Sequence, residues 1–253
     1  MAVLRCDVHS EVLGLGTSLT VLLPEAARAR DGADGPPLLY LLHGMSDDST
    51  TWLRRTGLER HVEGRGLAVV MPQVHRSYSL DTAVGERYGT FLAEELPALV
   101  HRFFRVSDRR ADTFVAGLSM GGYGAVRWAL RAPERFAAAA SLSGALDLAG
   151  PWSARVRPED PHLTTRLFGG RPVAGSDADL LHLVGRADPA RLPALRLWCG
   201  ADDALLPANR RFAAACAAAG VDAPLEVGPG AHDWAFWDAR VVDVLDWLPL
   251  RAR

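Results

Sequence analysis

The sequence predicts an α/β fold in which a mostly parallel sheet is covered by helices on both faces. Two observations lead to this class. Short, continuous apolar runs recur along the chain, and each stops at Gly, Pro, Ser or His, as strands buried on both faces do. Segments with helical spacing separate these runs, and strands that alternate with helices favour a parallel sheet.

The N-terminal stretch predicts two or three short strands. Residues 12–23 are rich in Val, Leu and Thr and are interrupted by Gly14 and Gly16, which suit a hairpin. Residues 31–37 are rich in Asp, Gly and Pro and predict a loop. The later strands are expected at residues 38–42, 67–71, 113–116, 136–142, 195–199 and 224–227.

Helices are expected between these strands. The alanine-rich segment 210–219 ends at Gly220, a natural C-cap, and the segment 121–130 holds small residues suited to close packing. Further helices are expected at residues 52–62, 91–104 and 241–248.

Residues 145–190 interrupt this alternation. They contain Pro151, Pro158, Pro161 and Pro172, scattered charges and no long apolar run. Short helices are expected around residues 163–168 and 179–184. A segment this short and polar is not expected to fold independently. We therefore interpret it as a cap or pocket wall inserted into a single domain spanning residues 1–253.

Composition narrows the class of protein. The 253 residues are 49% hydrophobic and 23% charged, with a formal net charge of −2, as in ordinary globular proteins. No large basic field is available for nucleic acid. The first residues lack the pattern of a secretion signal and no apolar run approaches the length of a membrane span, so a cytoplasmic location is expected. Cys6, Cys199 and Cys216 are widely spaced and predict reduced thiols rather than disulfides or a metal site.

The chemical signal is the pentapeptide Gly117-Leu118-Ser119-Met120-Gly121, which fits the G-x-S-x-G nucleophile elbow. In this motif a strand turns sharply into a helix, so that the serine hydroxyl projects from the sheet. Chance alone produces the pattern in roughly one such chain in ten. Here it lies between a predicted strand and a predicted helix, which is the context that the α/β-hydrolase fold requires.

The partners of Ser119 are expected in the chain order Ser, acid, His. Asp202 and Asp203 follow a predicted strand, and His232 follows the last one, so both sites lie where parallel sheets carry their chemistry. His232 would accept the serine proton, and one of the two acids would orient it. The residues alone leave both acids open.

The oxyanion of an acyl-transfer intermediate needs hydrogen-bond donors. We expect the backbone N–H of Met120 and that of Met45, with Gly44 permitting close approach of the loop. His43 is interpreted as a neutral structural residue rather than a catalytic one, and His43 and Gly44 are candidate pocket residues. Possible aromatic pocket walls are Trp52, Trp152, Trp234 and Trp237, although buried core positions are the alternative for at least two of them.

The chain resembles the esterase family that includes tributyrin esterases, esterase D, S-formylglutathione hydrolases and mycolyltransferases, and is most similar to the tributyrin-esterase branch. The resemblance implies hydrolysis of carboxylic esters without a cofactor, Asp203 as the catalytic acid, and Met45 and Met120 as oxyanion donors. It rests on residues 41–45, 94–97, 117–125, 142–144, 199–203 and 230–234, which occur in the family order.

The expected function is therefore that of a serine carboxylesterase that forms an acyl-enzyme on Ser119 from a small, short-acyl ester. An acyltransferase with the same triad is one alternative. An S-formylglutathione hydrolase is less favoured, because such enzymes have Ser-Gly-Leu-Thr-Cys where this chain has His43-Gly44-Met45-Ser46-Asp47. A binding protein on an inactive scaffold is disfavoured by the intact serine, acid and histidine.

Overall fold

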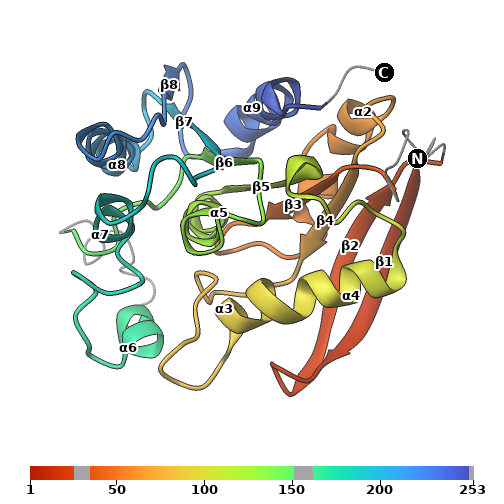
Figure 1. The fold of residues 1–253 in the computed structure, drawn as a ribbon, viewed down its shortest axis with the longest axis horizontal. Helices are drawn as coiled ribbons and strands as arrows, with labels where there is room; N and C mark the ends of the chain where they lie inside the picture. Colours follow the sequence, from red (N-terminus) through yellow and green to blue (C-terminus); the bar gives the residue numbers. More distant parts are fainter. Residues whose placement is uncertain (26–34, 151–161, 251–253) are drawn as a thin grey trace.

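A computed structural model of the protein describes residues 1–25, 35–150 and 162–250. Within these residues, eight strands form one sheet in the order β1-β2-β4-β3-β5-β6-β7-β8 (Figure 1). β1 and β2 form an antiparallel hairpin, β2 pairs antiparallel with β4, and every later pairing is parallel. The strands are Ala2–Ser10, Leu15–Leu23, Leu38–Leu42, Ala68–Pro72, Thr113–Leu118, Ala138–Leu142, Ala194–Gly200 and Leu225–Gly228.

The strands expected after the N-terminal hairpin are confirmed, with ends that shift by at most two residues. β3, β4, β5 and β6 are buried along their whole length, which explains their unbroken apolar sequences. In the hairpin, Gly14 occupies the turn at a φ of +67°, whereas Gly16 lies inside β2. Only the first of the two glycines therefore makes the turn.

Helices cover both faces of the sheet. On one face α1 (Thr51–Arg55), α2 (Leu58–Val62) and α9 (Trp234–Trp247) bury Trp52, Val62 and Val241 against the strands. On the other face α4 (Leu96–Phe103), α5 (Met120–Arg131) and α8 (Leu206–Ala218) complete the second core. Figure 1 shows α2 and α9 together above the sheet and α4 and α5 below it.

The single helix expected over residues 52–62 is wrong, because it is two helices. Thr56 takes an extended conformation between α1 and α2. The N–H of the next residue, Gly57, donates to Asp238 Oδ1 at 2.9 Å, from α9 on the same face. The break is therefore stabilised by a residue far along the chain.

The helix expected over residues 91–104 begins earlier and contains a wide turn. α3 (Tyr88–Thr90) continues into a π-helical turn at Phe91–Glu95 and then into α4. Pro97, near the start of α4, has no N–H to donate to the carbonyl of Ala93. Arg135 Nη2 donates to that carbonyl instead, at 3.1 Å.

Two other helices begin before their predicted positions. α8 starts at Leu206, and Gly220 lies just past its end at a φ of +70°. α9 starts at Trp234 rather than at residue 241, because Asp233 caps it by accepting the Phe236 N–H.

The two short helices expected within residues 145–190 are confirmed as α6 (Leu163–Phe168) and α7 (Leu180–Gly185). The N–H of Ala83 donates to two carbonyls of α6, at Arg166 and Leu167. The Tyr123 hydroxyl of α5 donates to the carbonyl of Ala178 at 2.8 Å. Pro151, Pro158 and Pro161 lie outside the described residues.

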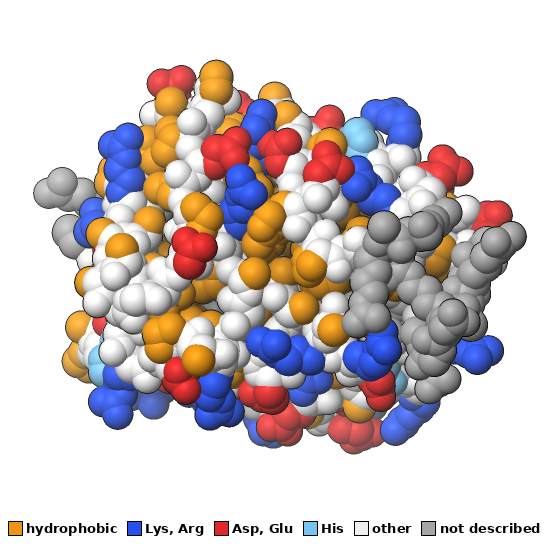
Figure 2. Space-filling view, turned by 45° about the horizontal axis from the view of Figure 1, so that its top comes forward, with side chains coloured by type: hydrophobic (Ala, Val, Ile, Leu, Met, Phe, Trp, Pro, Cys, Tyr) orange, Lys and Arg blue, Asp and Glu red, His pale blue; other side chains and the backbone are white. Residues whose placement is uncertain are grey.

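Cationic and anionic side chains are interspersed over the described residues of the face shown in Figure 2, in keeping with a formal net charge of −2. In the part of the chain that is described, no helix has the length and apolar character needed to span a membrane.

Candidate active site

Ser119 lies at a sharp turn between β5 and α5, with φ of +52° and ψ of −116°. Residues other than glycine rarely adopt this backbone conformation. The two glycines of the motif make this turn possible. A Cβ at Gly117 would lie 2.4 Å from the backbone of Gly121, and one at Gly121 would lie 2.4 Å from the carbonyl oxygen of Leu42. The sequence motif thus reflects two close backbone contacts.

Backbone hydrogen bonds hold Ser119 in this conformation. Its N–H donates to the carbonyl of Leu142 at 2.9 Å, and its own carbonyl accepts from Tyr123 and Ala145, each at 3.1 Å. These bonds join the turn to β6 and to α5. The strained residue is therefore fixed from three sides.

His232 lies on the loop between β8 and α9, directly before the capping residue Asp233. Its Nε2 is 3.0 Å from Ser119 Oγ, and its Nδ1 is 2.9 Å from Asp203 Oδ2. The ring of Trp237 packs perpendicular to the imidazole, with ring centroids 4.9 Å apart. Three residues from three separate loops thus form one line of hydrogen bonds.

The two acids left open by the sequence occupy different environments. The Asp203 side chain is fully buried, and its Oδ1 accepts the Leu205 N–H at 2.7 Å. Burial by itself raises the pKa of Asp203, but hydrogen bonds from His232 and Leu205 outweigh it and hold the pKa below its usual value. Asp202 is exposed, and its backbone N–H donates to the carbonyl of Gly230 at 3.0 Å. Of the two acids, Asp203 is the one that contacts His232.

The loop after β3 packs tightly against the serine turn. A Cβ at Gly44 would lie 2.6 Å from a methyl carbon of Leu118, the residue before Ser119. In the described part of the chain, the N–H groups of Met45 and Met120 donate no hydrogen bond. Two unpaired backbone donors therefore flank the turn that carries Ser119.

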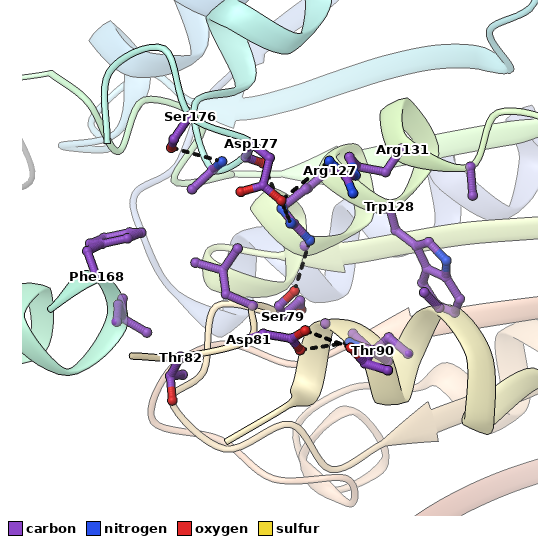
Figure 3. A pocket seen from close by; sticks show the side chains of 18 of the residues that line it. Ser79, Asp81, Thr82, Thr90, Arg127, Trp128, Arg131, Phe168, Ser176 and Asp177 are labelled. Atoms are coloured by element: carbon purple, nitrogen blue, oxygen red, sulfur yellow. Dashed lines mark hydrogen bonds and ion pairs between the residues drawn. The ribbon is translucent and has the colours of Figure 1, made fainter. Parts of the chain in front are cut away.

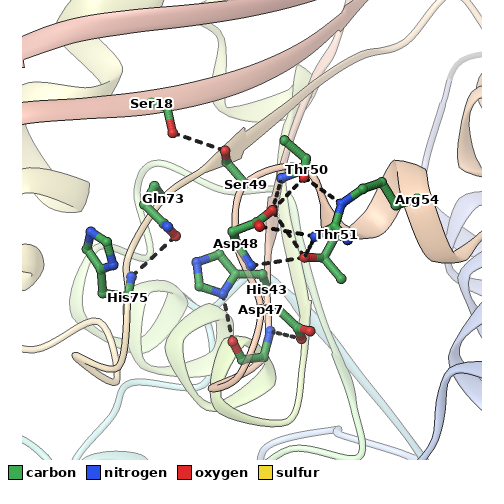
Figure 4. A network of polar contacts seen from close by, with 11 residues as sticks. Ser18, His43, Asp47, Asp48, Ser49, Thr50, Thr51, Arg54, Gln73 and His75 are labelled. Carbon is green, nitrogen blue, oxygen red and sulfur yellow. Dashed lines mark hydrogen bonds and ion pairs between the residues drawn. The ribbon is translucent and has the colours of Figure 1, made fainter.

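His43 does not line a pocket, contrary to one expectation, because it is buried beneath this loop. Its Nδ1 is 2.7 Å from the carbonyl oxygen of Gly44 (Figure 4). Its Nε2 accepts the Val74 N–H at 3.1 Å. Burial lowers the pKa of His43, which favours the neutral ring. The structural role expected for His43 agrees with these contacts.

The tryptophans have different environments. Trp52 is fully buried and donates to the carbonyl of Leu42 at 3.1 Å, so it is a core residue and not a pocket wall. Trp234 is half-buried and packs edge to face between Trp52 and Trp237. Trp152 lies outside the described residues. Sequence reasoning did not distinguish Trp237 from its neighbours, since nothing local marks its contact with His232.

The cysteines are free, as expected. Cys199 is the next-to-last residue of β7 and is buried. Burial, together with the charge of Asp203, raises the pKa of this thiol to about 12, so it stays protonated at neutral pH.

A cavity of about 630 Å³ lies beside the C-terminal half of α5, and Ser119, Asp203 and His232 do not line it. Its wall includes Arg127, Trp128 and Arg131 of α5, Asp81 from the loop before α3 and Asp177 from the segment before α7 (Figure 3). Arg127 donates to Asp177 Oδ2 at 2.8 Å, so these two charges in the wall form an ion pair.

Comparison with known proteins adds independent information. The family model described as "Putative esterase" matches residues 10–248 of the chain. An acetyl esterase of Caldicellulosiruptor saccharolyticus is 30% identical, and the match covers 98% of both chains.

Solved structures are similar over the same length. The substrate-bound fluorophosphonate-binding serine hydrolase FphF of Staphylococcus aureus is 32% identical, with a TM-score of 0.88 and coverage of 98% of both chains. The S-formylglutathione hydrolase FrmB of the same organism is 32% identical, with a TM-score of 0.81 and the same coverage. A ferulic acid esterase is 26% identical, with a TM-score of 0.83 over 98% of this chain and 97% of that one. The chain therefore belongs to this esterase family, has the α/β-hydrolase fold and is a serine hydrolase of carboxylic esters.

Proposed function

We propose that the protein hydrolyses small esters with short acyl groups through an acyl-enzyme on Ser119, with His232 as general base and Asp203 as the residue that orients it. The observation that carries this proposal is the continuous line of hydrogen bonds from Ser119 Oγ through His232 to Asp203, at 3.0 Å and 2.9 Å. The strained turn supports the role of Ser119, because it directs the hydroxyl away from the sheet.

Acylation follows from this arrangement. His232 Nε2 accepts the hydroxyl proton while Ser119 Oγ bonds to the ester carbonyl carbon, and the carbonyl π electrons move onto oxygen. The N–H groups of Met45 and Met120 donate to that oxyanion. When the carbonyl re-forms, the bond to the alcohol oxygen breaks and His232 returns the proton to it.

Deacylation repeats these steps with water. His232 removes a proton from the water as its oxygen bonds to the acyl carbon, and the proton then returns to Ser119 Oγ as the acid leaves. Asp203 keeps Nδ1 protonated, so that Nε2 is the free base, and it stabilises the imidazolium in both steps.

The acyl preference is drawn from the relatives. The curated relative at 30% identity is an acetyl esterase, which favours a short acyl group. Activated esters from acetyl to decanoyl, assayed at matched concentrations, test this preference, with Ser119→Ala as the blank. We expect kcat/KM to be highest at acetyl to butyryl and to fall with longer chains. A maximum at octanoyl or decanoyl would contradict the proposed substrate class.

A thioester substrate is the second candidate, because FrmB is as similar in sequence as FphF is. S-formylglutathione belongs in the same panel. The loop sequence His43 to Asp47 departs from the pattern of those hydrolases, so we expect the oxygen ester to be preferred. A kcat/KM at least tenfold higher for S-formylglutathione than for the acetyl ester would reverse this order.

A further inference from the structure

Gly44 lies between two peptide groups, and the orientation of both affects the Met45 N–H, which is the proposed oxyanion donor. The peptide that joins Gly44 to Met45 carries the Met45 N–H. Glycine is the residue that this position allows, since a Cβ would lie 2.6 Å from Asp47 Oδ2 and 2.6 Å from a methyl carbon of Leu118. Glycine is also the residue with the greatest backbone freedom, so a donor next to it needs a restraint.

The peptide between Gly44 and Met45 is held through its oxygen. The carbonyl of Gly44 accepts from the Asp47 N–H at 3.3 Å and lies 2.7 Å from His43 Nδ1. A carbonyl oxygen only accepts, so Nδ1 carries the proton of the neutral ring. The oxygen and the N–H of a trans peptide point in opposite directions, so holding the oxygen also sets the direction of the Met45 N–H.

The peptide before Gly44 is held by a side chain. Asp47 Oδ2 accepts the Gly44 N–H at 3.0 Å. Figure 4 shows the two contacts side by side, with His43 facing the carbonyl and the Asp47 carboxylate facing the N–H. Asp47 thus binds both the N–H and the carbonyl of Gly44, the first with its side chain and the second with its backbone.

The two adjacent donors consequently differ in availability. The Gly44 N–H is used by Asp47, whereas the Met45 N–H has no acceptor within the described residues. We propose that Asp47 is a positioning residue that immobilises Gly44 and thereby holds the Met45 N–H toward the oxyanion. This inference rests on the proposed function, in which Met45 is an oxyanion donor.

Asp48 offers a matched control in the same loop. Its carboxylate accepts from the Thr50 N–H at 2.7 Å and from Arg54 Nη2 at 3.0 Å. Neither contact involves Gly44. Replacing Asp48 therefore loosens the loop without removing the acceptor of the Gly44 N–H.

The test compares Asp47→Ala, Asp47→Leu, Asp47→Asn and Asp48→Ala. Asn keeps an acceptor of the same shape, whereas Ala and Leu remove it. Losing a whole oxyanion donor costs roughly a hundredfold to a thousandfold in kcat, so misdirecting one is expected to cost about tenfold to a hundredfold in the Ala and Leu variants. KM should stay within about threefold, since the donor acts in the transition state. Asp47→Asn and Asp48→Ala should keep kcat within about threefold of the wild type.

A second readout is the affinity for an alkyl trifluoromethyl ketone, which forms a tetrahedral oxyanion on the serine. Across the Asp47 series this affinity should fall in proportion to kcat/KM. A folded Ala or Leu variant with unchanged kcat would overturn the inference, and so would an equal loss in Asp47→Asn. If Ala and Leu do not fold, the Asn variant still decides, because a tenfold loss of kcat there contradicts a role that needs only an acceptor.

The Ser119→Ala enzyme separates this inference from the proposed function. If Ser119→Ala keeps its turnover, the proposed nucleophile is wrong. If Ser119→Ala is inactive but the Asp47 series keeps its kcat, the proposed function stands and only the role of Asp47 fails.

Discussion

The two ends of α5 carry polar clusters of opposite character. At the N-terminal end, Ser119 is strained at a φ of +52° and the carboxylate behind it, Asp203, has a side chain that is 0% exposed. Beside the C-terminal half, Asp177 pairs with Arg127 and Arg131 at 2.8 Å and 3.4 Å, but its side chain is 54% exposed.

The cavity at the second cluster does not coincide with the proposed active site. The cavity beside Arg127 measures about 630 Å³, yet the ion pairs that Asp177 forms in its wall are open to water, because the Asp177 side chain is 54% exposed. Water screens such pairs, which contribute little. At the serine end Ser119 and Asp203 are buried and His232 is one-third exposed, so the hydrogen bonds of Asp203 lie where water competes little and the loss of one is severe. Substitutions at the two ends should therefore differ greatly in effect.

Ser119→Ala is expected to have the largest effect. Removing the nucleophile should lower kcat by roughly a millionfold. Alanine has the same Cβ as serine, so the strained turn and its backbone hydrogen bonds should persist. Stopped assays on an acetyl ester measure the rate, and labelling with a fluorophosphonate should fail. A residual rate within tenfold of wild type would show that Ser119 is not the nucleophile.

The serine end was also the region that sequence reasoning described best. The turn is encoded locally. Gly117 and Gly121 are required by close backbone contacts, one between the two glycines themselves and one with the end of β3. The choice between Asp202 and Asp203 followed from the family resemblance and not from the residue type. In the structure it depends on backbone geometry, since Asp202 uses its N–H to bind Gly230 while the next side chain points inward.

Features that depend on distant residues were not predictable from local pattern. The break at Gly57 needs Asp238, which is 181 residues away. The carbonyl of Ala93, in the wide turn before Pro97, accepts a hydrogen bond from Arg135 on another segment. The early start of α9 is a different case, because Asp233 is an ordinary capping residue that the sequence displays.

The pair Asp203→Asn and Asp202→Asn tests the buried cluster against an exposed neighbour. Asparagine at position 203 can favour the wrong tautomer of His232, so kcat should fall by about ten-thousandfold. Asp202→Asn should change kcat by less than about threefold, because its side chain is exposed and its backbone N–H remains. Steady-state kinetics of both variants is the measurement. Similar losses at both positions would contradict the assignment of the acid.

The low pKa of Asp203 also predicts how stability depends on pH. Its pKa in the folded protein lies below the value of the unfolded chain, so this carboxylate stabilises the fold above about pH 4 and loses that contribution as the pH falls through the folded pKa. Asp203→Asn lacks this contribution. The difference in unfolding free energy between wild type and Asp203→Asn should therefore narrow when urea unfolding is repeated at pH 7, 5 and 3.5. A difference that grows toward acid pH would mean that the carboxylate is destabilised by folding.

The opposite end of α5 should show the smallest effect. Asp177→Asn removes the charge that pairs with Arg127 and Arg131, but Arg127 keeps its hydrogen bonds to the carbonyls of Asp177 and Ser79 at 3.0 Å and 3.3 Å. Exposed ion pairs contribute about 0–1 kcal/mol, so the unfolding free energy should fall by no more than about 1 kcal/mol. The loss should shrink further in 1 M salt, and kcat should stay within about twofold, since none of the three proposed catalytic residues lines this cavity. Urea unfolding at two salt concentrations and an acetyl-ester assay test this. A tenfold fall in kcat would contradict the separation of the two ends of α5, because the cavity would then influence the reaction proposed at Ser119.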